Sequence, residues 1–295
     1  MTVEVVNPTG IFAGNCAAGA SPAEARVRAE QRRFWRKDQS GRRPASHPVV
    51  RAMYAKRAAF IAGLVEDAVE SSVLDVGCGT GAMLPHLRRY FGRVVAVDFS
   101  PSMLDKLEAC DRVCGDASCL PLRSGSFDVV TASQVLHHVP ERERAAAVRE
   151  FARVARRCVV LYEPNRNNPA MFCFGLLKKT ERMSLAFSRK YLARLAECAG
   201  LSVVHCRAEG TILPNRTPTA LLWIARMFDR RPFNCVGFYV AVAGVPNRRE
   251  GLAAGPGLAK SEAVTALIVS QNPLALPSLQ VGERGYRMGS LASEG

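Results

Sequence analysis

The sequence has no run of about 18 uninterrupted apolar residues, the length that a membrane-spanning helix requires. Its first residues also lack the basic start, the long apolar stretch and the small-residue cleavage site of a secretory signal. We therefore expect a protein that is neither exported nor membrane-spanning, with a cytoplasmic location. The 295 residues are 48% hydrophobic, which is ample for the buried core of a globular protein.

Closely spaced metal-binding cysteines are missing as well. None of the ten cysteines forms a CxxC pair, and no histidine accompanies the neighbouring Cys110, Cys114 and Cys119. Because structural zinc sites are built from such pairs of cysteine and histidine, we expect no metal site. Cys158 and Cys206 lie in apolar stretches, where a thiol behaves as a small hydrophobic side chain, and this fits a reducing compartment.

Acidic residues are scarce relative to basic ones. Asp and Glu number 26 against 40 Lys and Arg, which gives a formal net charge of +14. Residues 21–60 alone hold eleven basic and three acidic side chains, a local charge of +8. Such a segment is either a solvated basic helix or a surface for an anionic substrate, a nucleic acid or acidic lipid head groups. An anionic membrane surface, contacted peripherally, is therefore one of the partners that we consider.

Short apolar stretches alternate with amphipathic ones from residue 72 onward. Five of these stretches are nearly continuous hydrophobic runs, as strands covered on both faces must be: SVLDV (72–76), RVVAVD (93–98), RVCGD (112–116), FDVVTA (127–132) and CVVLYE (158–163). Two more strands are predicted at 202–206 and 236–244. Helical spacing predicts helices at 22–37, 48–70, 81–91, 100–110, 141–155 and 188–201. The repeated order predicts an α/β fold: a doubly wound, Rossmann-like, seven-stranded and mostly parallel sheet with helices on both faces.

Three glycines follow the first predicted strand. The stretch VLDVGCGTGAML (73–84) places Gly77, Gly79 and Gly81 at alternate positions after Asp75. Glycines allow positive φ angles and let a ligand touch peptide N–H groups, while the free N-terminus of the next helix favours negative charge. The loop therefore predicts a ligand with an anionic end. Residues 77–82 also match the dinucleotide pattern G-x-G-x-x-G/A, with Asp98 about twenty residues on, so the loop alone leaves the ligand class open.

The loop, Asp75 in front of it and the stretch GDASCLPLRSGSFDVV (115–130) together resemble the class I S-adenosylmethionine-dependent methyltransferases. Within that superfamily the chain looks like the small-molecule branch, similar to ubiquinone and menaquinone methyltransferases. The resemblance implies S-adenosylmethionine as the cofactor, with its methionine part held by Asp75 and by loop residues Gly77, Cys78, Gly79 and Gly81. In one departure, the family often has Lys-Pro-Gly-Gly before its fifth strand, whereas RVARRCVVLYEP has no glycine.

The same resemblance assigns the adenosine half of the cofactor. Asp98 would accept hydrogen bonds from both ribose hydroxyls, since a carboxylate has two acceptor oxygens. Phe99 or Met103 would lie against the adenine, and Asp116 with Ala117 would read its edge. Considered without the resemblance, each aspartate alone is as well explained as a residue that ends a strand or caps a helix.

The stretch ASQVLHHV (132–139) follows the fourth predicted strand. In the family this segment forms the floor between the cofactor methyl group and the acceptor, so Ser133 and Gln134 are assigned to the cofactor site. His137 and His138 are candidate catalytic bases, because histidine has a suitable intrinsic pKa. In the alternative interpretation the two histidines only start the next helix and orient the loop. A sulfonium methyl is already activated, so transfer chiefly needs in-line approach and exclusion of water.

The remaining segments are assigned by composition. We expect a flexible N-terminus (1–20), a methyltransferase domain (21–245) and a largely disordered tail rich in Gly, Ala, Pro and Ser (246–295). Insertions at 164–187 and 207–235 interrupt the strand–helix order and are expected to form a cap and the acceptor site.

The expected reaction is methyl transfer from S-adenosylmethionine to a small apolar or anionic acceptor by direct in-line displacement. Three alternatives remain: an RNA methyltransferase that uses the basic N-terminal segment, an NAD-binding oxidoreductase, and a non-catalytic binding module built on the cofactor fold. An RNA enzyme would be expected to carry an Asn/Asp-Pro-Pro-Tyr/Phe signature after the fourth strand. The stretch ASQVLHHV is not such a signature, so a small molecule rather than nucleic acid is the expected partner.

Overall fold

The computed structural model describes residues 43–107, 110–213, 215–228 and 237–246, together with six scattered helical residues between 22 and 35. All of them belong to one compact unit, Met1–Leu258. The flexible N-terminus predicted for 1–20 lies outside the described residues, as does the predicted tail except for Pro246.

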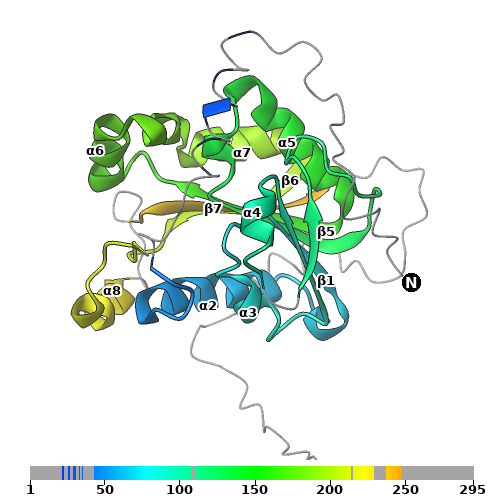
Figure 1. Cartoon of the computed structure of the whole chain (residues 1–295), viewed down its shortest axis with the longest axis horizontal. Helices are drawn as coiled ribbons and strands as arrows, with labels where there is room; N and C mark the ends of the chain where they lie inside the picture. The colour runs from blue at the N-terminus through cyan, green and yellow to red at the C-terminus, as the bar shows by residue number, and fades with distance from the viewer. Residues whose placement is uncertain are drawn as a thin grey trace, which may run out of the picture. The chain divides into compact units, whose positions relative to one another are not determined.

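Seven strands form a single sheet in the order β3-β2-β1-β4-β5-β7-β6 (Figure 1). Strands β1 to β5 run parallel, and β7 is antiparallel to both of its neighbours. The predicted doubly wound, mostly parallel sheet is therefore confirmed. The strands are β1 (Ser72–Val76), β2 (Arg93–Asp98), β3 (Asp111–Cys114), β4 (Phe127–Ser133), β5 (Ala155–Pro164), β6 (Leu201–Glu209) and β7 (Tyr239–Pro246).

Helices cover both faces of this sheet, with α2 and α3 on one face and α5 and α7 on the other (Figure 1). The α-helices are α2 (Pro48–Ala62), α3 (Leu84–Leu87), α4 (Pro101–Leu104), α5 (Glu141–Val154), α6 (Pro169–Leu177), α7 (Arg189–Cys198) and α8 (Leu222–Phe228). Short 3-10 helices are η1 (Ala68–Glu70), η2 (Leu136–His138), η3 (Lys179–Ala186) and η4 (Thr219–Leu221). None of the helices in the described part of the chain has the length and apolar character that crossing a membrane requires.

Four predicted helices are clearly shorter in the structure, those at 48–70, 81–91, 100–110 and 188–201. Proline and glycine explain one end of each of the first two. The helix predicted at 81–91 is reduced to α3, because Pro85 is tolerated only in the first turn of a helix. The helix predicted at 48–70 ends at Ala62, before Gly63, whose helix propensity is low. Pro48, by contrast, occupies the first turn of α2 as expected.

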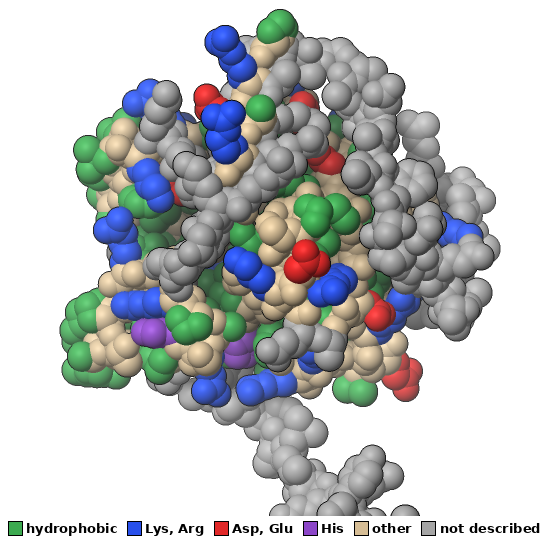
Figure 2. Space-filling view, viewed as in Figure 1, with side chains coloured by type: hydrophobic (Ala, Val, Ile, Leu, Met, Phe, Trp, Pro, Cys, Tyr) green, Lys and Arg blue, Asp and Glu red, His purple; other side chains and the backbone are tan. Residues whose placement is uncertain are grey.

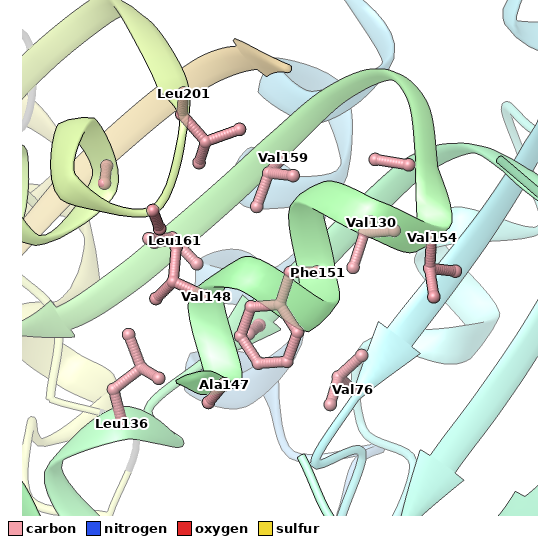
Figure 3. Close-up of a cluster of buried hydrophobic side chains, with 14 of the residues drawn as sticks. Val76, Val130, Leu136, Ala147, Val148, Phe151, Val154, Val159, Leu161 and Leu201 are labelled. Carbon is pink, nitrogen blue, oxygen red and sulfur yellow. The ribbon is translucent and has the colours of Figure 1, made fainter. Parts of the chain in front are cut away.

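The core consists of hydrophobic layers on the two faces of the sheet. On one face Phe151 of α5 lies among valines of the central strands, including Val76 and Val130 (Figure 3). On the other face the side chains of α2 and α3 pack on residues such as Val73 and Val160. Because side chains alternate between the faces of a strand, Asp75 falls on the α2 side of β1.

The connection that departs from the family pattern contains no turn. Helix α5 ends at Val154 and β5 starts at Ala155, directly after it. The Arg153 guanidinium donates to the carbonyl oxygens of Leu120 and Leu122, and these bonds tie the junction to the loop before β4. A glycine turn is therefore not required here.

Candidate active site

The carboxyl ends of β1, β2 and β4 bring the predicted cofactor residues to one edge of the sheet. Asp75 is the penultimate residue of β1, Asp98 ends β2, and Ser133 ends β4. The strand order reverses between β1 and β4, and open α/β sheets bind ligands at such a position. The structure thus gathers these residues where a ligand is expected.

The three loop glycines all have positive φ angles, yet their surroundings differ. A Cβ atom at Gly77 (φ +69°) would lie 2.4 Å from Val135 Cγ2, and one at Gly81 (φ +73°) would lie 2.5 Å from Leu107 Cδ2. A Cβ atom at Gly79 (φ +53°) would meet nothing within 4 Å. Gly77 and Gly81 are therefore needed for packing, whereas Gly79 borders open space in which a ligand can approach the backbone.

Asp98 fastens the glycine loop to the end of β2. Its Oδ2 accepts a hydrogen bond from Gly79 N (2.9 Å), and its Oδ1 accepts one from Ser100 N (2.9 Å). A carboxylate has about four acceptor positions, so Asp98 can also accept from a ligand hydroxyl. Its predicted role toward the ribose stays a prediction, and the structure adds a role in holding the loop.

Asp75 and Asp98 form a pair of buried acids, exposed by 3% and 6%. Burial, with the neighbouring Asp98 charge, raises the pKa of Asp75 to about 8, and burial also raises the pKa of Asp98. The Cys78 thiol in the same loop has its pKa raised by burial and then by Asp75. A cationic ligand beside these carboxylates would favour their ionised forms, so the site suits the ammonium and sulfonium charges of S-adenosylmethionine.

The residues predicted to contact adenine differ in how accessible they are. Asp116 Oδ1 accepts hydrogen bonds from Ser118 N (2.9 Å) and Ser118 Oγ (2.6 Å), so this carboxylate caps the turn after β3. Phe99 and Ala117 are half-buried, whereas Met103 is buried in α4 with 2% exposure. Their contacts with adenine remain predictions.

The loop after β4 is held in an unusual backbone conformation. Gln134 has φ +62° and is the single non-glycine residue with positive φ in the described ranges. Its peptide N–H donates to the Tyr162 carbonyl oxygen (2.7 Å), which anchors the loop to β5. Such strain of about 1–2 kcal/mol is typical of functional sites, and it lies where Ser133 and Gln134 are predicted to face the cofactor.

His137 is buried and held by carboxylates on both sides. Its Nδ1 lies 2.7 Å from Glu163 Oε2, and its Nε2 lies 3.6 Å from Glu181 Oε2. Glu163, which is fully buried, also accepts from the peptide N–H groups of Val135 (3.0 Å), Leu136 (2.7 Å) and His137 (3.3 Å). These bonds favour the alternative in which His137 orients the loop, because its ring nitrogens are directed at carboxylates.

His138 lies beside His137 at a ring-centroid distance of 4.0 Å and packs edge-on against Trp35 at 5.0 Å. Donor atoms of His137, His138 and Glu181 lie within 4.8 Å of one another, close enough for a metal ion to bridge them. Methyl transfer from a sulfonium requires no Lewis acid, so we assign this group no metal in the reaction. The predicted catalytic role of either histidine stays a prediction.

The sequence did not single out Arg57, which contacts the predicted site from α2. Arg57 is 5% exposed, and its Nη1 donates to Ser133 Oγ (2.6 Å). Its guanidinium lies over the rings of Tyr162 (4.6 Å) and Tyr239 (4.3 Å). In the sequence this arginine is one of eleven basic residues in 21–60, and nothing local distinguishes it.

The two predicted insertions form helices at the edge of the molecule. The first contains α6 and η3, in which Met171 is buried while Phe172, Leu176 and Leu177 are 41%, 50% and 87% exposed. Hydrophobic side chains gather over α6 and α8 at the left edge of Figure 2. The second insertion starts later than predicted, because β6 continues to Glu209, and residues 229–236 lie outside the described part.

The fold and the site together define a Rossmann-like protein with a glycine loop and two buried acids at the carboxyl edge of its sheet. Comparisons with known proteins give the class. Residues 74–162 match the family described as a methyltransferase domain. The chain is 25% identical over 225 residues to a malonyl-[acyl-carrier protein] O-methyltransferase of Herminiimonas arsenicoxydans, covering 74% of this chain and 79% of that enzyme.

Further relatives agree. A ubiquinone biosynthesis O-methyltransferase of Coxiella burnetii is 28% identical over 158 residues, which cover 45% of this chain and 64% of that enzyme. The crystal structure of a SAM-dependent methyltransferase from Archaeoglobus fulgidus shares the fold with a TM-score of 0.51 and 17% identity, covering 66% of this chain and 94% of that one. The chain thus carries a methyltransferase domain, and the relatives support an S-adenosylmethionine-dependent methyltransferase with S-adenosylmethionine as its cofactor.

Proposed function

We propose that this methyltransferase transfers the methyl group to an oxygen atom of a small-molecule acceptor by direct in-line displacement. The observation that carries the proposal is the 225-residue match to an O-methyltransferase, which extends well beyond the methyltransferase-domain match at 74–162. The ubiquinone O-methyltransferase match supports the same atom type.

The residues of this chain would contribute binding and positioning. The open face of Gly79, the acids Asp75 and Asp98, and the end of β3 would hold the cofactor, which supplies a methyl group already activated by its sulfonium charge. Glu163 fixes the loop that carries Ser133 and Gln134, so these residues stay aligned with the cofactor edge.

An experiment with isotopically labelled methyl groups tests the proposal. The purified full chain is incubated with methyl-labelled S-adenosylmethionine and with panels of phenols, alcohols, carboxylic acids, amines and short RNA. We expect label to appear only in hydroxyl or carboxyl compounds, as ethers or esters. Label in amines or RNA, with none in any oxygen compound, would refute the proposal.

A further inference from the structure

A small cavity beside the candidate site is lined by polar groups that come from three parts of the fold. It measures about 20 Å³ and lies between α2 and the carboxyl edge of β5 and β6, where Tyr239 begins β7. Its walls are Met53, Lys56, Arg57, Tyr162, Glu209, Gly210, Ile212 and Tyr239. A volume of this size holds one small polar group, such as a water molecule or a terminal oxygen of a ligand.

Three side-chain atoms in this cavity have no hydrogen-bond partner. They are Arg57 Nη2, Tyr162 OH and Glu209 Oε1, and each belongs to a residue that is at least nine-tenths buried, with exposures of 5%, 1% and 6%. A buried polar atom without a partner destabilises the folded chain. Three such atoms on residues that line one cavity are donor and acceptor positions for a further polar group.

The charges around the cavity are only partly compensated. Glu209 Oε2 lies 3.4 Å from Arg207 Nη2 and 4.0 Å from Lys56 Nζ, so one oxygen of this carboxylate is paired. Among the described residues no carboxylate forms an ion pair with Arg57, whose charge is met by the Ser133 hydroxyl and three tyrosine rings. A guanidinium that is buried in this way remains ready to donate to an additional acceptor.

The three atoms restrict the chemistry of the occupant. Arg57 can only donate, the ionised Glu209 can only accept, and the Tyr162 hydroxyl can do either. A carboxylate would accept from Arg57 but leave Glu209 Oε1 without a donor, and an ammonium would donate to Glu209 but leave Arg57 Nη2 without an acceptor. A hydroxyl group accepts from the first and donates to the second.

We propose that this cavity, the hydroxyl pocket, binds a hydroxyl group of the methyl acceptor. The proposal rests on the proposed function, because Arg57 links the pocket to Ser133 at the end of β4, where the acceptor is expected. Burial, with Glu209 adding to it, raises the pKa of Tyr162 well above its usual range, so its phenol keeps the proton it can donate.

Three matched probes test the occupant: benzyl alcohol, benzoate and benzylamine, which share a ring and differ in one polar group. Their binding to the full chain saturated with S-adenosylhomocysteine is measured by ligand-observed NMR. We expect benzyl alcohol to bind about tenfold more tightly than either charged probe, since each charged probe leaves a buried polar group of the pocket unpaired. Equal binding of the three probes would show that the cavity holds only water and would overturn the inference.

Two variants separate the pocket from general effects. Glu209→Gln replaces one acceptor by an amide that also donates, so benzoate is expected to gain about tenfold and the preference for the alcohol to shrink. Tyr162→Phe should weaken benzyl alcohol about fivefold, as the loss of one hydrogen bond implies. Tyr191→Phe is the control, because its hydroxyl accepts from Arg144 (3.0 Å) on the opposite face of the sheet.

The readouts also keep this inference apart from the proposed function. Unfolding curves and titration with S-adenosylhomocysteine show whether each variant folds and binds the cofactor product. A chain that methylates an oxygen compound but shows unchanged probe preference in Glu209→Gln would overturn only the hydroxyl pocket. Absence of label in every oxygen compound would overturn the proposed function, whatever the probes do.

Discussion

Replacing loop glycines one at a time separates packing from cofactor approach. Gly77→Ala and Gly79→Ala both force alanine into a positive φ, which costs about 1–2 kcal/mol. Only at Gly77 does the new methyl group also collide with Val135, at 2.4 Å, and overpacking of this kind costs about 1–3 kcal/mol more. We therefore expect Gly77→Ala to lose about 2–5 kcal/mol of unfolding free energy, and Gly79→Ala about 1–2 kcal/mol.

For cofactor affinity we expect the opposite order, with a larger loss in Gly79→Ala than in Gly77→Ala. At Gly79 the methyl group enters the open space beside the loop, so calorimetric titration with S-adenosylhomocysteine should give an affinity at least about tenfold weaker, as a 1.4 kcal/mol loss implies. Urea unfolding of the ligand-free chain measures the stability term separately. The reasoning is refuted if Gly79→Ala binds as tightly as the unaltered chain, or if Gly77→Ala is no less stable than Gly79→Ala.

Three further predictions concern single side chains. Burial and the Asp98 charge raise the pKa of Asp75 to about 8, so the folded chain keeps a proton that the unfolded chain loses above about pH 4. The free energy of unfolding therefore falls as the pH rises from about 4 to about 8. Asp75→Asn removes this loss, so its gain in melting temperature should grow from pH 5 to pH 8.5; a gain independent of pH would contradict the assignment. Glu163→Gln should cost about 3 kcal/mol in urea unfolding, because one amide cannot accept from four donors, whereas the control Glu181→Gln should cost less than about 1 kcal/mol. Gln134→Gly should match or exceed the unaltered stability while Gln134→Val loses about 1–2 kcal/mol, and equal stability of the two variants would mean that no backbone strain is present.

Much of the fold was predictable because its strands are covered on both faces. The nearly continuous hydrophobic runs at 72–76 and 93–98 coincide with β1 and β2, and the glycine loop lies between them as predicted. The ends of the helices were predicted less well than those of the strands. Periodicity predicted a helix at 81–91, but Pro85 allows α3 to start only at Leu84, and its end at Leu87 had no signal in the sequence.

The candidate site was only partly predictable, because sequence patterns report local roles. Asp75, Asp98 and the glycines follow strands and could be placed from that alone. The backbone partners of Glu163 lie 26–28 positions away along the chain, and the partner of Arg57 lies 76 positions away. No local sequence pattern predicts such contacts. Gln134 was placed at the site, but its positive φ had no signal, since glycine, asparagine and aspartate are the residues that usually adopt it.

Adjacent side chains of strand β5 lie on opposite faces of the sheet. Tyr162 faces the hydroxyl pocket on the α2 side, and Glu163 holds the histidine loop on the other. Strand β5 starts directly after α5, and its pairing with β4 has one irregularity, between Ala155 and Cys158, after which the register is regular up to Tyr162. Adding or deleting one residue between 158 and 161 would exchange the phenol and the carboxylate. Homologous enzymes that keep both functions should therefore tolerate substitutions along this strand while keeping its length fixed.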